Sequence, residues 1–380
     1  MSRARSGIYL DYNATAPIRP QARAAVLSAL DIGGNPSSVH AAGRAARDLV
    51  ETARAQVAAL VGAHVGRTVF TGGGAEANAI ALTSLARQAE RLIVGATEHE
   101  VVTETSKALG LPIEVWPVTR HGVADLDWLR DRLSAPAGVA LVALMLANTE
   151  TGVIQPVAEA AALVQAAGGR LHVDAVQAAG KVEVDFASLG ADSMALSGHK
   201  LGGPQGVGAL VFARRALLTP LWGGGGQEQG LRAGTENVAG IAGFGAAAQA
   251  AGEGLADLAA MAQWRDATAL GLKAAGALIA GEGAQRLPNT LCLTLDGWES
   301  IRQVMMLDLA GVQVSAGAAC SSGKVKPSGV LSAMGFGDLA ASALRVSGGW
   351  ATTRDDWSAF ADAWLEGASR LAARRRTEVA

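Results

Sequence analysis

Short β-rich runs alternate with amphipathic helical segments from about residue 68 to residue 213, and this alternation constrains the fold more than any other feature. The segments 41–61, 76–88 and 156–167 carry apolar residues at helical spacing. The strand-like runs are TVF, RLIVG, IEVWPV, VALVALMLAN, RLHVDAV, DSMALS and GALVFA. Strands that alternate with helices favour a parallel sheet, because each crossover takes a helix. We therefore expect an α/β layered domain with a mostly parallel sheet and helices on both faces.

The last third of the chain follows a different pattern. A glycine run at 223–226 leads into QEQGLRAGTEN, which is too rich in glycine to lie inside a helix or strand. An Ala-rich helical stretch from about 240 to 280 follows. After it come TLCLTL, ESIRQVMMLDLA, VQVSAGAAC, LRVSGG and a closing helix over 354–376. Because 380 residues exceed the usual size of one core, we predict a second, smaller α+β lobe.

Composition excludes several classes of protein. Half of the residues are hydrophobic, yet no apolar run reaches the about 18 residues of a membrane helix, and MSRARSGIYL lacks the apolar stretch of a secretory signal. A net charge of −2 argues against nucleic acid as the main partner. Two cysteines cannot make a disulfide framework or a metal site by themselves. We therefore expect a cytoplasmic protein without a membrane or nucleic-acid partner.

Polar and glycine-rich residues directly follow several of the predicted strands. Examples are TVF-TGGGAE, LMLAN-TETG, HVD-AVQ and MALS-GHK-LGGPQG. In open α/β sheets, ligands bind outside the carboxyl ends of the strands, where such residues converge. The sequence therefore predicts the active site at this edge of the sheet.

Two of these turns suggest specific chemistry. In GGGAE at 72–76, glycines let the backbone approach an anion, and free N–H groups of the following helix can bind it. The pattern is neither GxGxxG nor a P-loop, which disfavours dinucleotides and nucleoside triphosphates. Lys200, in SGHK, could have a lowered pKa and form a Schiff base. A plain glycine turn and a surface lysine are the alternative interpretations.

Asp174 and His99 are the next candidates. Asp174 ends an apolar strand, and a buried carboxylate needs a cationic partner, of which a protonated pyridine nitrogen is one. His99 follows RLIVG and would point into the same edge, as a ring that stacks or a group that moves protons. A helix-capping aspartate and a structural histidine are the alternatives.

The two cysteines lie in contrasting contexts. Cys320 lies in SAGAACSSG, where small neighbours leave a thiol uncovered and suit a nucleophile. Cys292 lies in TLCLTL, whose alternation predicts a buried core residue. Two further residues could bind a carboxylate: Arg345 in LRVSGGW offers a planar fork, and Asn35 in GGNPSS could support it. A surface ion pair and a turn residue explain Arg345 and Asn35 equally well.

Taken in order, these motifs resemble the class V aminotransferase family, and most closely its cysteine desulfurases of the NifS/IscS type. The resemblance runs nearly end to end, through YLDYNATAP, GNPSSVH, VFTGGGAE, TEHEVV, HVDAVQ, SGHK, GLRAGTEN, AACSSG and LRVSGGWATT. SGHK together with AACSSG is highly specific. The resemblance implies the type I fold of pyridoxal-phosphate (PLP) transferases. It implies a large PLP-binding domain over 14–255, and a small α+β domain from 1–13 and 256–380 that carries the Cys320 loop and Arg345.

The resemblance also implies roles for individual residues. Lys200 would hold PLP as a Schiff base and later abstract the α-proton of the substrate. Asp174 would pair with the pyridinium nitrogen, Gln177 would bind the ring oxygen, and His99 would stack on the ring and help to move protons. The phosphate would be bound by a set of polar groups from several segments, namely Gly74, Ala75, Ser197, His199 and Thr235, the last from a neighbouring subunit of a homodimer.

Arg345 and Asn35 would hold the carboxylate of L-cysteine, while the Cys320 thiolate attacks the substrate sulfur. The products would be L-alanine and a persulfide on Cys320, which supplies sulfur for iron-sulfur cluster assembly through an acceptor or scaffold protein. No intrinsic metal site is implied, although Cys320 could transiently ligate a cluster on a scaffold partner. KVKPSGVL after AACSSG matches the iron-sulfur branch of the family.

Four positions depart from the pattern of the family. Ala75 replaces a threonine that also binds the phosphate, a loss of about 1 kcal/mol. Thr149 replaces an asparagine that contacts the ring, Gln229 replaces an arginine, and Gly348 replaces a leucine. None of these changes removes a group that the chemistry requires, so they bear on cofactor affinity and rate.

Three alternatives remain open from the sequence. Transamination and selenocysteine cleavage use the same scaffold, and transamination does not need Cys320. Ala75 and Thr149 would also suit a non-catalytic scaffold that delivers sulfur. The resemblance leaves the sulfur acceptor open among nitrogenase maturation, general cluster assembly and transfer-RNA thiolation.

Overall fold

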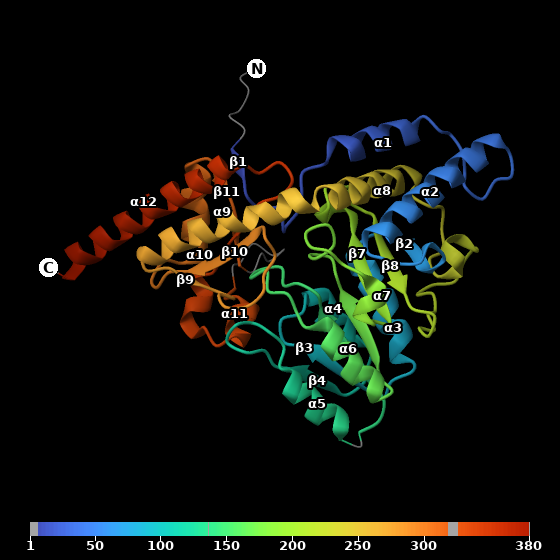
Figure 1. Ribbon diagram of the computed structural model, residues 1–380, viewed down its shortest axis with the longest axis horizontal. Helices are drawn as coiled ribbons and strands as arrows, with labels where there is room; N and C mark the ends of the chain where they lie inside the picture. The colour runs from blue at the N-terminus through green and yellow to red at the C-terminus, as the bar shows by residue number, and fades with distance from the viewer. Residues whose placement is uncertain (1–6, 136, 318–325, 380) are drawn as a thin grey trace.

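A seven-stranded sheet forms the centre of the larger part of the molecule (Figure 1). The computed structural model describes residues 7–135, 137–317 and 326–379. In chain order the strands are β2 (Thr68–Thr71), β3 (Arg91–Gly95), β4 (Ile113–Trp116), β5 (Ala140–Met145), β6 (Arg170–Asp174), β7 (Ser193–Ser197) and β8 (Gly208–Phe212). Their spatial order is β2-β8-β7-β6-β5-β3-β4. β8 pairs antiparallel with both neighbours and the other pairs are parallel. The predicted mostly parallel sheet is therefore confirmed, and each strand lies within a predicted run or overlaps it.

Both faces of this sheet are covered, because successive residues of a strand point to opposite faces. In β5, Leu141 and Ala143 belong to one buried apolar cluster, whereas Val142 and Leu144 belong to another. α3 (Gly74–Ala86) supplies buried residues to the first cluster. The second takes residues from α2 (Ala41–Leu60), α6 (Val157–Ala166), α7 (Phe186–Leu189) and α8 (Val238–Glu253).

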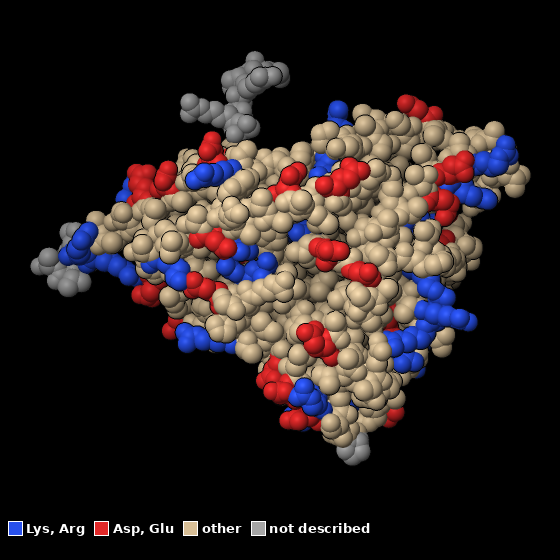
Figure 2. Space-filling view, viewed as in Figure 1, with Lys and Arg blue, Asp and Glu red and all other residues tan. Residues whose placement is uncertain are grey.

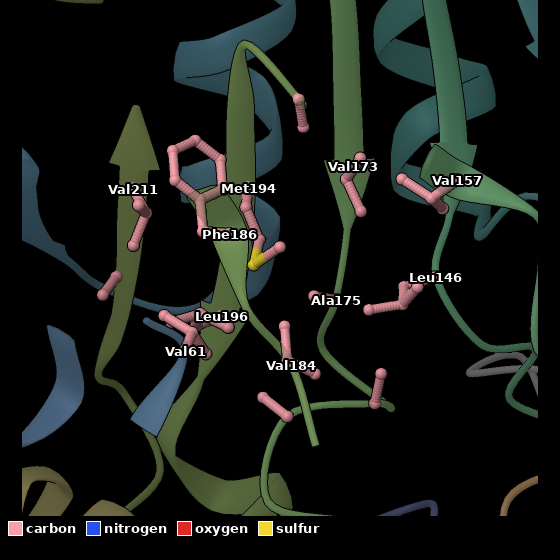
Figure 3. Packing of buried hydrophobic residues seen from close by; sticks show 14 of the residues in the cluster. Val61, Leu146, Val157, Val173, Ala175, Val184, Phe186, Met194, Leu196 and Val211 are labelled. Carbon is pink, nitrogen blue, oxygen red and sulfur yellow. The ribbon is translucent and has the colours of Figure 1, made fainter. Parts of the chain in front are cut away.

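Figure 3 shows part of the second cluster at close range. Val173 of β6, Met194 and Leu196 of β7 and Val211 of β8 point into the same layer as Phe186 of α7. Packing of these side chains fixes the ends of β6 and β7 relative to each other. The polar turns of the predicted site begin at those ends. The remaining helices of the larger part are α1 (Pro20–Leu30), α4 (Glu100–Ala108) and α5 (Leu126–Ser134).

A smaller unit lies beside the large sheet (Figure 1). Its antiparallel sheet has the order β12-β13-β10-β9, and β1 pairs with β11 in parallel. The strands are β1 (Ile8–Tyr9), β9 (Leu278–Ile279), β10 (Thr290–Thr294), β11 (Val312–Gln313), β12 (Ser315–Ala316) and β13 (Leu344–Ser347). The helices are α9 (Leu255–Ala274), α10 (Ser300–Leu309), α11 (Gly329–Ala333) and α12 (Arg354–Val379). A buried cluster that includes Leu10, Leu291, Trp357 and Trp364 joins the N-terminal segment to this unit.

The Ala-rich helical stretch predicted from about 240 to 280 consists of two helices. α8 ends at Glu253 and α9 begins at Leu255, with Gly254 as the cap between them. Glycine has a low helix propensity, so Gly254 after Gly252 favours a break there. The expectation was also too long at its C-terminal end, because α9 stops at Ala274 and β9 takes up 278–279. Both helices run from the large sheet toward the small unit (Figure 1).

Charge on the visible face is mixed. Figure 2 shows Lys and Arg side chains interspersed with Asp and Glu over this face. Within the part of the chain that the structure describes, no helix is long and apolar enough to cross a bilayer. Four short 3-10 turns complete the structure: η1 (Val65–Arg67), η2 (Gly198–Lys200), η3 (Gln227–Gly230) and η4 (Gly337–Ser342).

Candidate active site

Lys200 lies in η2, directly after β7, with its amine turned toward the N-terminal segment. Its Nζ donates to the backbone oxygens of Asn13, at 2.5 Å, and of Ala14, at 2.7 Å. Desolvation, followed by the positive charge of Arg345, lowers the pKa of Lys200 from 10.5 to about 8. An amine with this pKa is half neutral near pH 8, so the nucleophilic and basic form is accessible far below the pH that an ordinary lysine requires.

Asp174, at the end of β6, presents a buried carboxylate to the same region. Its Oδ1 accepts from the backbone N–H of Val176 and its Oδ2 from Nδ2 of Asn78, both at 2.9 Å. Burial raises the pKa of Asp174, while the charges of His99 and Lys200 oppose that shift. None of the ion pairs found among the described residues includes Asp174. A cation placed against this carboxylate would stabilise its ionised form.

Asp174 is held by a buried chain of hydrogen bonds that sequence reasoning missed. Nε2 of His172 lies 2.7 Å from Oδ1 of Asn78, and Nδ1 lies 2.8 Å from Oγ of Ser193. Because Asn78 gives its amide N–H to Asp174, its oxygen accepts from His172, whose Nδ1 then accepts from Ser193. Burial lowers the pKa of His172 to about 3, so this neutral form persists. The available signal was that His172 and Asp174 are two residues apart and share one face of β6.

Glu98 adds a second carboxyl group close to Asp174. Its Oε1 accepts from the backbone N–H of Met145, and its Oε2 is buried without a hydrogen-bond partner among the described residues. Burial, and then the charge of Asp174, raise the pKa of Glu98 to about 8. Glu98 is therefore mainly protonated at neutral pH, so it adds little negative charge beside Asp174.

Gln177 and Thr149 contact each other next to Lys200. Nε2 of Gln177 donates to Oγ1 of Thr149, at 2.8 Å, and to the backbone oxygen of Asn13, at 2.9 Å. Lys200 and Gln177 thus share one acceptor, the buried Asn13 oxygen. Sequence analysis assigned no role to Asn13, although it lies within the quoted motif YLDYNATAP.

The glycine turn predicted as an anion cradle packs directly against Ser197. α3 begins at Gly74, and Gly73 before it has φ of +154°, which glycine tolerates. A Cβ at Gly74 would lie 2.7 Å from Cγ2 of Val176 and 3.3 Å from Cβ of Ser197. Only glycine fits this contact, so the N-terminus of α3 lies against the residues that follow β6 and end β7. Ala75, in the first turn of α3, is exposed.

The two other predicted anion ligands lie in different settings. Nδ1 of His199 is 3.1 Å from Oγ1 of Thr15, and burial lowers the pKa of His199 to about 4, so the ring is neutral. Thr235 is exposed in the loop between η3 and α8. Its contact with a neighbouring subunit stays a prediction.

His99 caps a helix as well as facing Asp174. It is the N-cap of α4, and its Nδ1 accepts from the backbone N–H of Val101 at 3.1 Å. The neutral ring must then carry its proton on Nε2. His99 is exposed, and a positive charge on its ring would lower the pKa of Asp174. The structural interpretation of His99 is thus correct in part, and the predicted stacking role stays open beside it.

Arg345 is buried and already has an acidic partner. Its Nη2 lies 2.8 Å from Oδ1 of Asp11, whose Oδ2 accepts from Oγ of Ser315 at 2.8 Å. Nε of Arg345 is buried without a hydrogen-bond partner among the described residues. The guanidinium therefore keeps donor capacity for a further anion. The predicted surface alternative is wrong, since only 4% of Arg345 is exposed.

Asn35 lies apart from Arg345 within this chain. Asn35 is exposed in the loop between α1 and α2. Arg345 lies in β13, which pairs with β10 in the sheet of the small unit (Figure 1). Oδ1 of Asn35 accepts from the backbone N–H of Ser37 at 2.9 Å, which forms a turn. Its role toward a carboxylate stays a prediction.

Of the two cysteines, only Cys292 lies among the described residues. Cys292 is fully buried in β10, as predicted, and burial raises the pKa of its thiol. Cys320 lies outside the described residues. The residues on either side of that gap are anchored: Gly317 donates its N–H to Ala343 O at 2.9 Å, and Oγ of Ser328 donates to Oε2 of the buried Glu150 at 2.6 Å.

Two of the positions that depart from the family pattern, Gln229 and Gly348, lie in constrained surroundings. Gln229 has φ of +59°, in the left-handed region that non-glycine residues adopt at a cost. A Cβ at Gly348 would lie 2.7 Å from Sδ of Met261, so a larger residue there requires Met261 to move.

Comparison with known proteins identifies the family. Residues 8–360 match the family model described as aminotransferase class V. A cysteine desulfurase from Cereibacter sphaeroides is 42% identical over 86% of each chain. A NifS-like protein from Rickettsia africae has a solved structure with a TM-score of 0.87 and 32% identity, covering 95% of this chain and 99% of that one. SspA, solved in complex with cysteine, has a TM-score of 0.77 and 27% identity over 89% of this chain and 98% of that one. The chain therefore belongs to the cysteine desulfurases of the class V aminotransferase family.

Proposed function

We propose that this chain uses PLP to convert L-cysteine to L-alanine, transferring the sulfur to Cys320 as a persulfide for iron-sulfur cluster assembly. One observation carries the proposal: a lysine with a pKa of about 8 faces the same region as a buried carboxylate that has no ion-pair partner among the described residues. These are the two groups that a PLP enzyme requires, an amine to bind the aldehyde and an acid to keep the ring nitrogen protonated. The solved complex of the related SspA with cysteine supports the substrate.

The residues present fit PLP. The N-terminus of α3 at Gly74, with Ser197 against it, offers unpaired N–H groups and a hydroxyl for a phosphate. We assign Ala75 and His199, and Thr235 of a second subunit, to the same phosphate. Asp174 would hold the ring nitrogen, whereas Gln177 and Thr149 would lie at the ring oxygen and His99 would stack on the ring. When bound, PLP supplies an electron sink for the carbanion that forms at the substrate.

Lys200 has two tasks in the proposed reaction. Its amine attaches the cofactor, and after the substrate has displaced it, the free amine removes the proton from the substrate Cα. Both tasks need the neutral form, which the lowered pKa makes accessible. The two carbonyl acceptors at Asn13 and Ala14 orient the amine before it reacts.

Arg345 and Cys320 complete the reaction. Arg345, oriented by Asp11, would bind the substrate carboxylate, and Asn35 would assist it. The Cys320 thiolate then attacks the substrate sulfur, so a sulfur–sulfur bond forms while the Cβ–sulfur bond breaks. The electron pair of the broken bond stays with the substrate carbon, which takes up protons to become alanine, and Cys320 carries the persulfide. The buried Cys292 thiol has no part in this step.

The same proposal extends to the organisation of the protein. We assign PLP binding to a large domain over 14–255, and the Cys320 loop and Arg345 to a small domain formed by 1–13 and 256–380. The two main buried clusters support this division, with one exception: Leu287, from 256–380, packs in the cluster of the large part. The exposed Thr235 suits a homodimer in which each subunit completes the site of the other, and a sulfur acceptor or scaffold protein would receive the persulfide.

The test of this function is an assay of the purified, PLP-loaded chain with L-cysteine and a reducing thiol. We expect L-alanine and sulfide in equal amounts. A 2-oxo acid as product would instead indicate transamination, and turnover of selenocysteine alone would indicate a selenocysteine lyase. A chain that takes up no PLP would indicate a sulfur-delivery scaffold.

Asp174→Asn should fold normally but bind PLP weakly. The Asn78 side chain can reverse, so that its oxygen accepts from the amide of the new side chain and its NH₂ donates to Nε2 of His172. The neutral His172 ring then carries its proton on Nδ1 and donates it to Oγ of Ser193. The loss of the charge opposite a buried cation costs about 3–5 kcal/mol, or on the order of 10²–10⁴-fold in affinity. Equilibrium titration with PLP, together with urea unfolding of the apo-protein, measures both quantities. Unchanged affinity would contradict the pairing of Asp174 with the ring, and exposed Asp127→Asn is the matched control.

A further inference from the structure

Lys181 is a second buried lysine close to Lys200, and the proposed reaction leaves it without a task. It lies in the turn that follows β6, four residues after Gln177, and only 6% of it is exposed. Lysine is seldom buried, because desolvation of its ammonium group is costly. The positive charges of Lys200 and Arg345 act against Lys181 as well. A lysine kept at such a position calls for a compensating role.

The amine of Lys181 contacts two amide oxygens and forms none of the ion pairs found among the described residues. Nζ donates to Oε1 of Gln177 at 2.5 Å and to Oδ1 of Asn13 at 2.8 Å. Both acceptors belong to residues next to Lys200: Gln177 Nε2 and Lys200 Nζ both donate to the Asn13 backbone oxygen. Lys181 therefore lies behind the residues that face the cofactor site.

These contacts determine which way the Gln177 amide points. An amine donates and a carbonyl oxygen accepts. If the Gln177 amide were reversed, its NH₂ would face Nζ of Lys181 and its oxygen would face the Asn13 carbonyl. The contact between the two oxygens would be repulsive, and Nζ of Lys181 would lose its acceptor on Gln177, so Nε2 must lie on the side of Thr149 and Lys200. The Asn13 side chain is oriented in the same way, because its Nδ2 donates to Thr149 O at 3.0 Å.

We propose that Lys181 is a positioning residue that holds Gln177 with its Nε2–H directed at the ring oxygen of PLP. This inference rests on the proposed function, in which Gln177 binds that oxygen. Lys181 touches neither cofactor nor substrate, and acts through Gln177. Without Lys181, the Gln177 oxygen loses its donor and the amide is held only by the contacts of its Nε2 with Asn13 O and Thr149 Oγ1, so its hydrogen bond to the ring oxygen is less firmly fixed.

The test compares Lys181→Met with the wild type as PLP-loaded proteins. Methionine has a similar length and no donor, so the site stays filled. We expect a shifted visible absorption maximum and an about tenfold larger dissociation constant for PLP, which corresponds to the loss of one hydrogen bond. Lys181→Gln restores a donor near Gln177 and should recover most of the wild-type spectrum. Lys181→Leu, which also lacks a donor, takes the place of Lys181→Met if that variant does not fold.

A double-mutant cycle separates positioning from a general structural effect. If Lys181 acts through Gln177, adding Lys181→Met to Gln177→Met should leave the spectrum and the PLP affinity of Gln177→Met unchanged. Additive changes would overturn the inference, and so would a wild-type spectrum and affinity in both single Lys181 variants. Exposed Lys273→Met, which loses only its pair with Glu282, is the control. A wild-type chain that takes up no PLP would refute the proposed function itself, an outcome that the wild-type titration shows separately.

Discussion

Lys200→Ala is expected to abolish sulfide release from cysteine and the visible absorption of the lysine-linked cofactor. The variant loses the covalent attachment point and the base that moves the Cα proton. Loss of a positioned base alone costs about 10²–10⁴-fold in rate, and loss of the attachment adds to this. Absorption spectra and assays of alanine and sulfide measure the two effects. Full turnover in this variant would refute the assignment of Lys200.

Stability should change little in the same variant, because Lys200 is a partly buried amine whose folded-state pKa is depressed. Between its unfolded pKa of 10.5 and its folded value of about 8, the unfolded chain binds more protons than the folded one. The ionised form of Lys200 therefore destabilises the fold, fully so below about pH 8. Removal of the lysine takes this penalty away together with two hydrogen bonds. Exposed Lys107→Ala, which loses only a contact with Glu104, is the matched control.

A pH readout accompanies this prediction. Only the neutral amine attacks the cofactor aldehyde, so PLP uptake by wild-type apo-protein should accelerate as pH rises through about 8. An ordinary surface lysine would require a pH near 10.5 for the same effect. Stopped-flow absorbance across pH 6.5–9.5, roughly one and a half units to either side of the pKa, follows the uptake.

Cys320→Ala should keep the bound cofactor and its spectrum but lose sulfide release. Asp174 and Lys200 lie at the ends of β6 and β7, and their described hydrogen bonds are made to other segments of the chain, so removal of the Cys320 thiol should leave those bonds in place. Without that nucleophile the Cβ–sulfur bond has no acceptor for its sulfur, and we expect turnover to fall at least about 10³-fold, or about 4 kcal/mol in activation free energy. Sulfide and alanine assays on PLP-loaded protein measure this loss.

Cys292→Ala provides the matched control for the cysteine. Its thiol is fully buried in β10 and its pKa is raised, so it is neither accessible nor ionised. This variant should retain sulfide release while it loses some stability to the cavity that the missing sulfur leaves. Unchanged desulfuration in Cys320→Ala, or its loss in Cys292→Ala with the fold intact, would place the nucleophile elsewhere.

Local pattern predicted most of the fold. The seven strand-like runs correspond to β2 through β8, because a buried parallel strand needs a short apolar run between helical segments. The helical stretch predicted over about 240–280 was too long at its end and hid a break, because alanine-rich sequence favours helix on both sides of Gly254. Where that helix pair breaks depends on a single glycine and on which core each half joins, and neither is a periodic signal.

The candidate site was predicted only in part. Asp174, Gln177, Ser197 and Lys200 follow strands that neighbour each other in the sheet, so sequence position alone brought them to one edge. Asn13 was missed because its contact with Lys200 joins residues 187 positions apart. His172, Asn78 and Lys181 were missed for a related reason: their roles are hydrogen bonds to other side chains, which carry no periodicity.

By itself, the sequence determined the α/β architecture, the edge of the sheet that holds the site and the order of its motifs, since these follow from local hydrophobic pattern and from residues at strand ends. Tertiary structure alone decided the state of those residues. Burial lowers the pKa of Lys200 and raises that of Asp174, and the N-terminal segment supplies the acceptors at Asn13. Desolvation and hydrogen-bond partners depend on what the fold brings together, and a linear pattern does not contain that information.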